Sequence, residues 1–389
     1  MVLHPQKRSA LFKTLMLACS ATMAAGCGDE LAPANPETAT AGVGEVHQGV
    51  TRTLSPGMDV RLAFEQLQPG DTLVVSPGVY EIGSLGPNLK PGLSSARINV
   101  TASDPNNPPL FKGWLILRRP TNWTINRIRV QATVAGREAM TVAGGLHWSI
   151  QNSEFFGASN TGAFANVAIS SWNPDPSTGT CAQKTTCENP QHWEFIYNCI
   201  HHAGLGTATG HTQSTDHNVY VNANGYSPGY ISRNIMFLAP AGSHVKVGSG
   251  GSITEPGASG VRIRYNTLHN AARSVLISGN LTGVEVNWNL FKKATGGDGV
   301  SAGTYLNGLS NPKGVYVVDN YGHDMDRNLY VNPNVEPGSY VAGGEYGNPV
   351  YNTVETEPGF DASSCTGYHP SNATAKKFGR YSTYFGSGI

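Results

Sequence analysis

The chain has 389 residues with 26 basic and 26 acidic side chains, so its formal net charge is zero at neutral pH. This balance excludes capture of a nucleic acid or another polyanion by bulk charge, although a local basic patch could still act. Only 13% of the residues are charged, about half the usual share. Gly, Asn, Ser and Thr are abundant, and such a surface suits sugars better than nucleic acid.

The N-terminus has the pattern of a secretory signal. Lys7, Arg8 and Lys13 precede an apolar run, Leu15 to Ala25, that is too short to span a bilayer. The run ends Ala-Ala-Gly directly before Cys27, which resembles the lipobox of bacterial lipoproteins. We therefore expect Cys27 to carry a lipid, with an ordinary cleavage site nearby as the alternative. The protein would be exported to the cell envelope, either the periplasm or the outer membrane and surface, and held there by its lipid anchor alone.

Composition divides the chain into four regions. Residues 1–26 are the expected signal peptide, and residues 27–52, rich in Ala, Pro, Thr, Glu and Gly, are the expected flexible tether. The remaining stretch of roughly 330 residues shows no second linker, which favours one elongated repeat domain over two globules. We place this domain at residues 53–324 and assign residues 325–389 to a C-terminal cap or wrapping tail.

Four cysteines follow Cys27, an even number in an oxidising compartment. Cys181 and Cys187 bracket a short polar loop and are expected to form a disulfide. A pairing of Cys199 with Cys365 is left open. Zinc is disfavoured because there is no CxxC motif and no histidine pair at ligand spacing beside these cysteines.

A short module ending in asparagine recurs six times along the domain. Each copy has apolar residues in register before the asparagine, and most are followed by another apolar pair, which indicates a strand, a sharp turn and another strand. Asparagine tolerates the left-handed backbone that such a turn requires, and its amide can bond to the asparagine stacked above it. The six asparagines are Asn152, Asn198, Asn234, Asn266, Asn289 and Asn320.

A second set of strands, with strict alternation of apolar residues, lies between these modules. Two strand types that recur in turn, with variable loops and no helical period between them, predict the rungs of a right-handed parallel β-helix, an all-β solenoid. A sandwich or propeller would need hairpin signals, and Asn-Gly and Asp-Gly turns are scarce. The second set comprises residues 166–169, 218–221, 244–247 and 274–277.

The segment from Ala63 to Tyr80 resembles the opening of the pectin-lyase-like β-helix superfamily. In that fold an amphipathic segment covers the N-terminal end, and a Pro-Gly-Asp turn, here Pro69 to Asp71, leads into the first rung. A cap is needed because an open end exposes strand edges.

Alignment of the second strand set places its side chains on faces. The apolar residues that flank Tyr220, Lys246 and Leu276 point inward, so these three side chains should stack outward on rungs about 4.8 Å apart. Asn218 and His244 are expected in the neighbouring outward row.

Further candidate residues lie beside these rows. Arg273 precedes the next strand and could overhang the patch, whereas Asp216 and His217 lie at its edge. His217 shares the inward parity of Val219. Arg264 is a further candidate for substrate binding.

This set of residues meets the demands of β-elimination from a uronic-acid polysaccharide. The reaction needs a base for the proton beside the carboxylate, a group that stabilises the enolate and an acid for the leaving oxygen. Lys246 is the candidate base, because crowding by Arg273 and burial by substrate would lower its pKa. Tyr220 or His244 would be the acid, and Arg273 with Asn218 would hold the carboxylate. A chance meeting of polar residues on an outer face is the alternative.

The chain between Lys246 and Asn280 resembles the alginate lyase and chondroitinase B family of polysaccharide lyases. In that family a catalytic lysine is followed one rung later by a catalytic arginine. The lysine matches Lys246, but the arginine position falls on Ile277, and Ser278 stands where the family usually has histidine. The family's acidic calcium ligands are replaced by Leu238 to Ser243, so calcium is not supported and we expect no cofactor.

A less specific resemblance covers the central third of the chain. It is to uncharacterised bacterial β-helix proteins in which a His-Asn-x-Tyr strand, here His217 to Tyr220, precedes a His-x-Lys strand, here His244 to Lys246. This resemblance implies no established reaction.

The sequence leaves two classes of function. One is a lyase for a uronic-acid-containing polysaccharide, and a mannuronan epimerase would share its proton-abstraction step. The other is a non-catalytic surface lipoprotein that binds polysaccharide or a cell-surface partner, which the missing arginine favours. Glycoside hydrolysis ranks low because Asp216 is isolated and no carboxylate pair lies on the predicted face. We expect a monomer whose partner is polysaccharide rather than nucleic acid.

Overall fold

The structure, a computed structural model, describes residues 48–175, 181, 187–203, 216–248, 256–294, 301–311, 314–343, 358–359 and 364–382. The expected signal peptide, Cys27 and most of the expected tether lie outside the described residues. Within the described ranges, no helix is long and apolar enough to cross a membrane.

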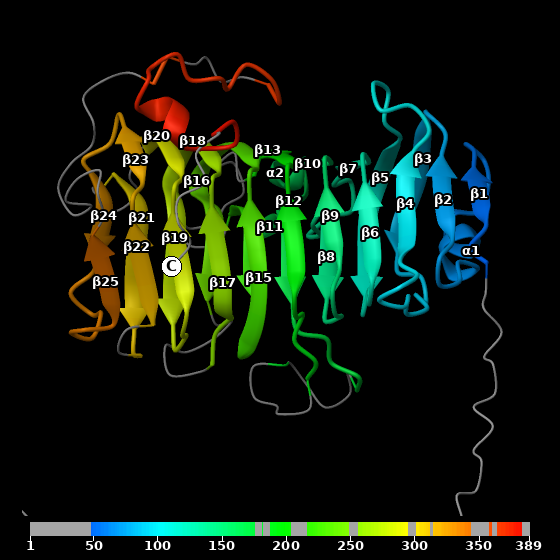
Figure 1. Cartoon of the computed structure of the whole chain (residues 1–389), viewed down its shortest axis with the longest axis horizontal. Coiled ribbons are helices and arrows are strands. Elements are labelled where there is room, and N and C mark those ends of the chain that lie inside the picture. Colours follow the sequence, from blue (N-terminus) through cyan, green and yellow to red (C-terminus); the bar gives the residue numbers. More distant parts are fainter. Residues whose placement is uncertain are drawn as a thin grey trace, which may run out of the picture. The chain divides into compact units, whose positions relative to one another are not determined.

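One side of the fold is an 11-stranded parallel sheet, shown in Figure 1, in which each strand pairs with the strand of the next rung. Neighbours follow the order of the chain, so successive rungs stack in sequence order. Its strands are β1 (Thr51–Leu54), β2 (Thr72–Val75), β4 (Ile98–Ala102), β6 (Trp123–Asn126), β9 (Ser149–Gln151), β12 (Trp193–Ile196), β15 (Tyr226–Ser232), β17 (Ser259–Arg264), β19 (Val284–Asn287), β22 (Val315–Val318) and β25 (Tyr340–Gly343).

A second sheet of 14 strands forms the rest of each rung. Its pairings among successive rungs are also parallel. Its strands are β3 (Val79–Leu85), β5 (Leu110–Arg118), β7 (Arg129–Gln131), β8 (Met140–Ala143), β10 (Glu154–Phe156), β11 (Ala165–Ser170), β13 (Cys199–His201), β14 (His217–Asn222), β16 (Ile235–Gly248), β18 (Thr267–Gly279), β20 (Leu290–Ala294), β21 (Ala302–Leu309), β23 (Tyr321–His323) and β24 (Arg327–Val331).

The second sheet has two legs that meet where the longest strands change partners. The first part of β16 pairs with β13, and its last part pairs with β14. We call β7, β10, β13, β20, β23 and the first parts of β5, β16 and β18 the short leg. The long leg comprises β8, β11, β14, β21, β24 and the last parts of β5, β16 and β18. Each rung therefore has three sides, and the predicted all-β parallel β-helix is confirmed.

Side-chain alternation explains the core between these three sides. In β14 and β16 the valines at positions 219, 221, 245 and 247 are fully buried, and the residues between them face away from the core. Large rings fill the wider rungs, as where Trp148 and Trp193 stack with ring centroids 5.4 Å apart. Removal of this apolar surface from water is the main force that holds the rungs together.

Buried asparagines form a ladder at the turn between the 11-stranded sheet and the short leg. In the first four of them, the backbone N–H donates to Oδ1 of the asparagine in the next rung at 2.8–3.0 Å. Each side-chain Nδ2 also donates to a backbone carbonyl of the preceding rung. The predicted stacking of asparagine amides is therefore confirmed, and it satisfies polar groups inside the fold. The ladder comprises Asn198, Asn234, Asn266, Asn289 and Asn320.

The left-handed residue of these turns is the one before each ladder asparagine. The expectation that asparagine itself adopts this conformation was therefore wrong for five modules. The ladder side chain points inward to reach the next rung, so the residue before it makes the turn. In the first module Asn152 itself is left-handed (φ 51°). Ser153 occupies the ladder position there, and its backbone N–H donates to Asn198 Oδ1. The other left-handed residues are Tyr197, Arg233, Tyr265, Trp288 and Asp319.

A short helix packs at the N-terminal end, as the predicted cap requires. It is α1 (Val60–Glu65), whose buried Phe64 stacks on Trp123 with ring centroids 6.2 Å apart. The predicted Pro-Gly-Asp turn ends at Asp71, which is fully buried and accepts a hydrogen bond from the N–H of Val50 at 2.9 Å. The strand β2 begins at the next residue. The other short helices are α2 (Ala158–Thr161) and η3 (Ala375–Lys377).

The strands continue beyond the expected boundary at residue 324, because β24 and β25 still pair in the two sheets. From residue 364 the chain crosses the outer face of the short leg, as Figure 1 shows for the red segment near β18 and β20. There Tyr368 lies against Phe237, and Phe378 lies against Tyr321, with ring centroids 5.8 and 5.6 Å apart. We call residues 364–382 the C-terminal segment.

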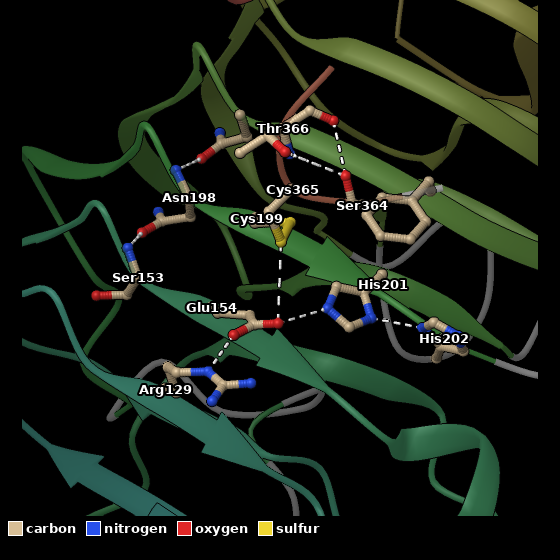
Figure 2. The surroundings of a disulfide bond; sticks show 12 residues. Arg129, Ser153, Glu154, Asn198, Cys199, His201, His202, Ser364, Cys365 and Thr366 are labelled. Carbon is tan, nitrogen blue, oxygen red and sulfur yellow. Dashed lines mark hydrogen bonds and ion pairs between the residues drawn. A yellow bond between two sulfur atoms is a disulfide. The ribbon is translucent and has the colours of Figure 1, made fainter. Parts of the chain in front are cut away.

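Two disulfides are present. The predicted bond between Cys181 and Cys187 is confirmed, with Cα atoms 5.7 Å apart. Cys199 and Cys365 also pair, with Cα atoms 5.6 Å apart. This second bond ties the C-terminal segment to β13 (Figure 2).

Candidate functional site

The long leg carries a continuous row of outward positions, in which each Cα pairs with that of the next rung. We call it the outer row. Tyr220 and Lys246 are direct neighbours in it, and Leu276 follows, as the alternation predicted. In chain order the outer row is Ile116, Thr141, Ala168, Tyr220, Lys246, Leu276, Tyr305 and Tyr330.

Lys246 and Tyr220 touch each other across adjacent rungs. Lys246 Nζ lies 4.7 Å from the centroid of the Tyr220 ring, and both side chains are half-buried. Burial lowers the pKa of Lys246 and raises the pKa of Tyr220 to about 12. Burial disfavours the charged form of each group, so Lys246 gains neutral amine while Tyr220 keeps its proton at neutral pH. The pair therefore sets a lysine with a lowered pKa beside a protonated phenol.

Arg273 lies within β18 rather than before it. Its Cα pairs with that of Ser243, and its guanidinium Cζ lies 3.9 Å from the centroid of the Tyr305 ring. The Tyr305 hydroxyl accepts a hydrogen bond from Asn332 Nδ2 at 3.0 Å. Tyr305 follows Leu276 in the outer row, so the guanidinium lies on the far side of Leu276 from Lys246. The expected crowding of Lys246 by Arg273 is not what lowers the lysine pKa, because burial is the cause.

Asn218 and His244 are not on the outer face, contrary to expectation. Both are fully buried. Asn218 Nδ2 donates to His244 Nδ1 at 2.9 Å and to the carbonyl oxygen of Phe237 at 3.2 Å, while its Oδ1 accepts from Asn166 at 2.9 Å. Phe237 belongs to the short leg, which therefore covers the first outward position of the long leg. Burial also lowers the pKa of His244 to about 3, so the ring is a neutral imidazole at neutral pH and not the imidazolium that a general acid would need.

Asp216 and His217 are also buried, at the start of β14. The His217 ring nevertheless lies beside the site, with its centroid 5.7 Å from that of Tyr220. Its Nδ1 accepts the backbone N–H of Ser243 at 3.2 Å, which assigns the proton to Nε2. The buried His217 ring therefore packs beside Tyr220 and is not at the surface where a ligand would bind.

Arg264 belongs to a different side of the molecule. It lies at the end of β17 in the 11-stranded sheet and forms an ion pair with Glu285. Arg262 binds the same carboxylate at 3.1 Å. The structure therefore does not bring Arg264 together with the outer row, because the Asn turn and the short leg separate its strand from the long leg.

A second polar cluster lies on the short leg, beside the Cys199–Cys365 disulfide (Figure 2). Glu154 accepts hydrogen bonds from Arg129 Nε and from His201 Nε2, the latter at 2.9 Å. Burial raises the pKa of Glu154, but the bonds from His201 and Arg129 outweigh it and hold that pKa below its ordinary value. A hydrogen bond joins His201 Nδ1 and His202 Nδ1 at 2.5 Å. The charges of Arg129 and Glu154 balance each other, and the cluster packs beside the disulfide.

The same cluster contains the one group of described donors close enough to hold a metal ion. Its ligand atoms belong to Cys199, His201 and Cys365 and lie within 4.8 Å of one another. Both sulfurs are joined in the disulfide, so neither is a thiolate that a metal would bind. The group is therefore structural in the oxidised protein.

Sequence reasoning missed the distal half of the outer row. Tyr305 and Tyr330 have ring centroids 4.9 Å apart, and Arg327 lies over Tyr330 at 5.4 Å. The segments Gly303 to Leu306 and Asn328 to Val331 repeat the alternation of the second strand set. Extension of that alignment by two rungs would have found both tyrosines.

No family model and no curated protein matches this sequence. Among solved structures, the chain is similar to an alginate lyase from Paenibacillus sp. str. FPU-7, at 12% identity and a TM-score of 0.45 over 79% of this chain and 98% of that chain. It is also similar to pectate lyase Pel9A, at 12% identity and a TM-score of 0.39 over 76% of this chain and 80% of that chain. A third similar structure is a mannuronic acid specific polysaccharide family 6 lyase from human gut microbiota. The identity is 12% and the TM-score 0.32, over 80% of this chain and 92% of that chain. The fold assignment rests on the strand pairings above and not on these comparisons.

Proposed function

We propose that the protein is an exported lipoprotein, anchored through Cys27, that cleaves a uronic-acid-containing polysaccharide by β-elimination on the outer row. One observation carries the proposal. Lys246 and Tyr220 are in contact on adjacent rungs, where burial shifts the pKa of the lysine down and that of the tyrosine up. The lowered pKa brings the lysine closer to the neutral form that acts as a base, and Tyr220 keeps the hydroxyl proton that an acid donates.

The proposed reaction has one proton removed and one returned. Neutral Lys246 Nζ takes the proton from the carbon beside the carboxylate, and the electron pair moves into the carboxylate as an enolate. The pair then forms a carbon–carbon double bond as the bond to the glycosidic oxygen breaks. The Tyr220 hydroxyl donates its proton to that oxygen. Arg273, on the far side of Leu276, would stabilise the carboxylate of the enolate.

A non-catalytic polysaccharide-binding protein is the second candidate. The observation that favours it concerns the position at which the lyase resemblance implies an arginine. Ile277 stands there and is fully buried in the core, so no cation reaches the outer face from that position. Arg273 is instead stacked on Tyr305. Tyr220, Lys246 and Tyr330 of the outer row are half-buried, and such a surface can hold sugars without cleaving them.

The test is release of unsaturated oligosaccharides, followed by ultraviolet absorbance, from alginate, pectate and glycosaminoglycans. We expect product from one of these polymers. Lys246→Ala and Tyr220→Phe should each lower kcat by about 10²- to 10⁴-fold, the usual contribution of a general base or acid. Lys112→Ala removes a half-buried lysine of the short leg on another rung, one that is paired with Glu81, and serves as the matched control, with unchanged kcat.

Two results would decide against the lyase. Binding without any unsaturated product from all three polymer classes would favour the binding protein. Activity that survives Lys246→Ala at the wild-type rate would remove the lysine from its role as base.

A further inference from the structure

A walled pocket lies at the opposite end of the long leg from Tyr330, four rungs before Lys246. It encloses about 230 Å³. One wall is the segment Pro87 to Pro91, and the other is formed by Arg118, Arg119 and Trp172. Neither the proposed reaction nor the sequence motifs use any of these residues.

The proline-containing wall is held in place before any ligand arrives. The Gly86 carbonyl accepts a hydrogen bond from Arg61 at 2.8 Å, and the N–H of Asn88 donates to Glu65 at 3.0 Å. At the other end of the segment, the indole of Trp123 donates to the Lys90 carbonyl at 2.8 Å. Fixed walls reduce the ordering cost of binding.

The wall that carries Trp172 is fixed as well. Trp172 and Glu188 form an antiparallel bridge with two backbone hydrogen bonds of 2.8 and 2.9 Å. Cys187, next to Glu188, is also joined to Cys181 by a disulfide. The bridge therefore holds Trp172, which lines the pocket.

The two arginines differ in how their charge is matched. Arg119 Nε donates to Glu188 at 2.6 Å, and its guanidinium lies 4.9 Å from the Trp172 ring centroid. Arg118 has only a neutral partner among its described contacts, the Gly86 carbonyl at 3.4 Å. The pocket therefore holds one positive charge more than its acidic side chains balance. A guanidinium matches the geometry of a carboxylate, and an indole face suits a sugar ring.

Strand register connects this pocket to Lys246. Arg118 lies two positions after Ile116 of the outer row, so both side chains face outward from β5. From Ile116 the outer row runs through Thr141, Ala168 and Tyr220 to Lys246, which is four rungs and about 19 Å. The outward residues of the two rungs that follow β5 are small, namely Thr141, Ala143, Ala168 and Ser170. Because these side chains are short, they do not obstruct the outer face of the long leg between the pocket and Tyr220.

We propose that the pocket is a distal subsite for the carboxylate of a uronic-acid residue, four rungs from the reacting sugar. The protein then binds an extended polyuronate at two sites, the pocket and the outer row at Lys246. The proposal rests on the polyuronate substrate of the proposed function. Arg118 binds the carboxylate, and Trp172 contacts the sugar ring. An extended sugar chain advances by about one rung spacing per ring, so a chain long enough to reach both sites binds as a bivalent ligand.

The test uses calorimetry with oligomannuronates and oligogalacturonates of increasing length, on protein that carries Lys246→Ala so that no chain is cut. We expect affinity to rise steeply once the chain spans both sites. Arg118→Ala should abolish that rise and weaken the long oligomers about tenfold, while the short ones change little. Arg127→Ala is the matched control, because it removes an exposed arginine from the turn after β6, on another side of the rung.

Among the described residues, Arg118 makes one long hydrogen bond, so its removal should leave the thermal midpoint unchanged. Equal effects of Arg118→Ala and Arg127→Ala on long oligouronates would overturn the subsite. So would an equal loss for neutral oligosaccharides of the same length. If wild-type protein makes no unsaturated product but the Arg118-dependent rise is present, the lyase fails and the subsite stands. If wild-type protein cleaves but the rise does not depend on Arg118, the subsite fails and the lyase stands.

Discussion

At the level of single residues, burial acts most strongly on His244. The side chain is fully buried and its pKa falls to about 3, from an ordinary value of 6.5. As the pH falls below 6.5, the unfolded chain takes up this proton while the folded protein does not. The free energy of unfolding is therefore highest above pH 6.5 and falls as the pH approaches 3. The loss from this one group should be about 3 kcal/mol between pH 6.5 and 4.

Urea unfolding at a series of pH values measures this loss. His244→Asn should flatten the acid side of the stability profile by that amount, because asparagine extends the buried row of Asn166 and Asn218 without taking up a proton. His192→Asn is the control, since His192 is exposed and its positive φ of 52° suits asparagine. Profiles of equal slope for wild type and His244→Asn would show that His244 is not buried as a neutral ring.

The residue scale also shows how far local pattern predicts a site. Alternation along the strands placed Tyr220 and Lys246 together, because a side-chain period of two and parallel register are enough to bring them into contact. The same alternation placed Asn218 and His244 outward, and there it failed. Those positions are covered by Phe237 from the short leg, and no local pattern records the angle at which two legs meet.

At the level of elements, the two disulfides should differ in their contribution to stability. The bond between Cys199 and Cys365 spans 166 positions of sequence, whereas that between Cys181 and Cys187 spans 6. Loop-closure entropy gives about 5 kcal/mol for the first and about 2 kcal/mol for the second. The long-range bond also holds the C-terminal segment on the short leg, so its loss exposes the apolar faces of Phe237 and Tyr321.

Guanidinium unfolding of the paired variants measures the difference. Cys199→Ser with Cys365→Ser should lose about twice as much as Cys181→Ser with Cys187→Ser, and it should also bind a hydrophobic dye. Equal losses in the two variants would mean that the C-terminal segment is not anchored through this bond.

Element boundaries illustrate what the repeat could and could not reveal. The asparagine modules identified the turn, because a buried amide ladder needs the same residue in every rung. They assigned the left-handed conformation to asparagine rather than to the residue before it, such as Tyr197 or Tyr265, since the sequence does not show which way the amide points. The strands past residue 324 were missed because the alignment of the second strand set stopped before β24, and β25 lacks the asparagine module.

At the scale of the whole molecule, the strand order has an energetic consequence. Each rung pairs with the rung before it and the rung after it, so stability should be close to a sum of terms from single rungs and their neighbours. Phe111 in β5 and Phe291 in β20 are both buried and stand six strand steps apart on the short leg, about 29 Å. Leucine at either position should cost about 1–2 kcal/mol, because it leaves space in a packed core.

The test is a pair of double-mutant cycles followed by urea unfolding. The costs of Phe111→Leu and Phe291→Leu should add within about 0.5 kcal/mol, because the two rings share no neighbour. Phe155→Leu with Phe195→Leu should deviate from additivity by about 0.5–3 kcal/mol, because those two rings lie 5.5 Å apart. Coupling between Phe111 and Phe291 as large as that between Phe155 and Phe195 would mean that a packing change is transmitted along the solenoid and not only to neighbouring rungs. In that case the two ends of the long leg, which the proposed polyuronate chain must bridge, could not be altered independently.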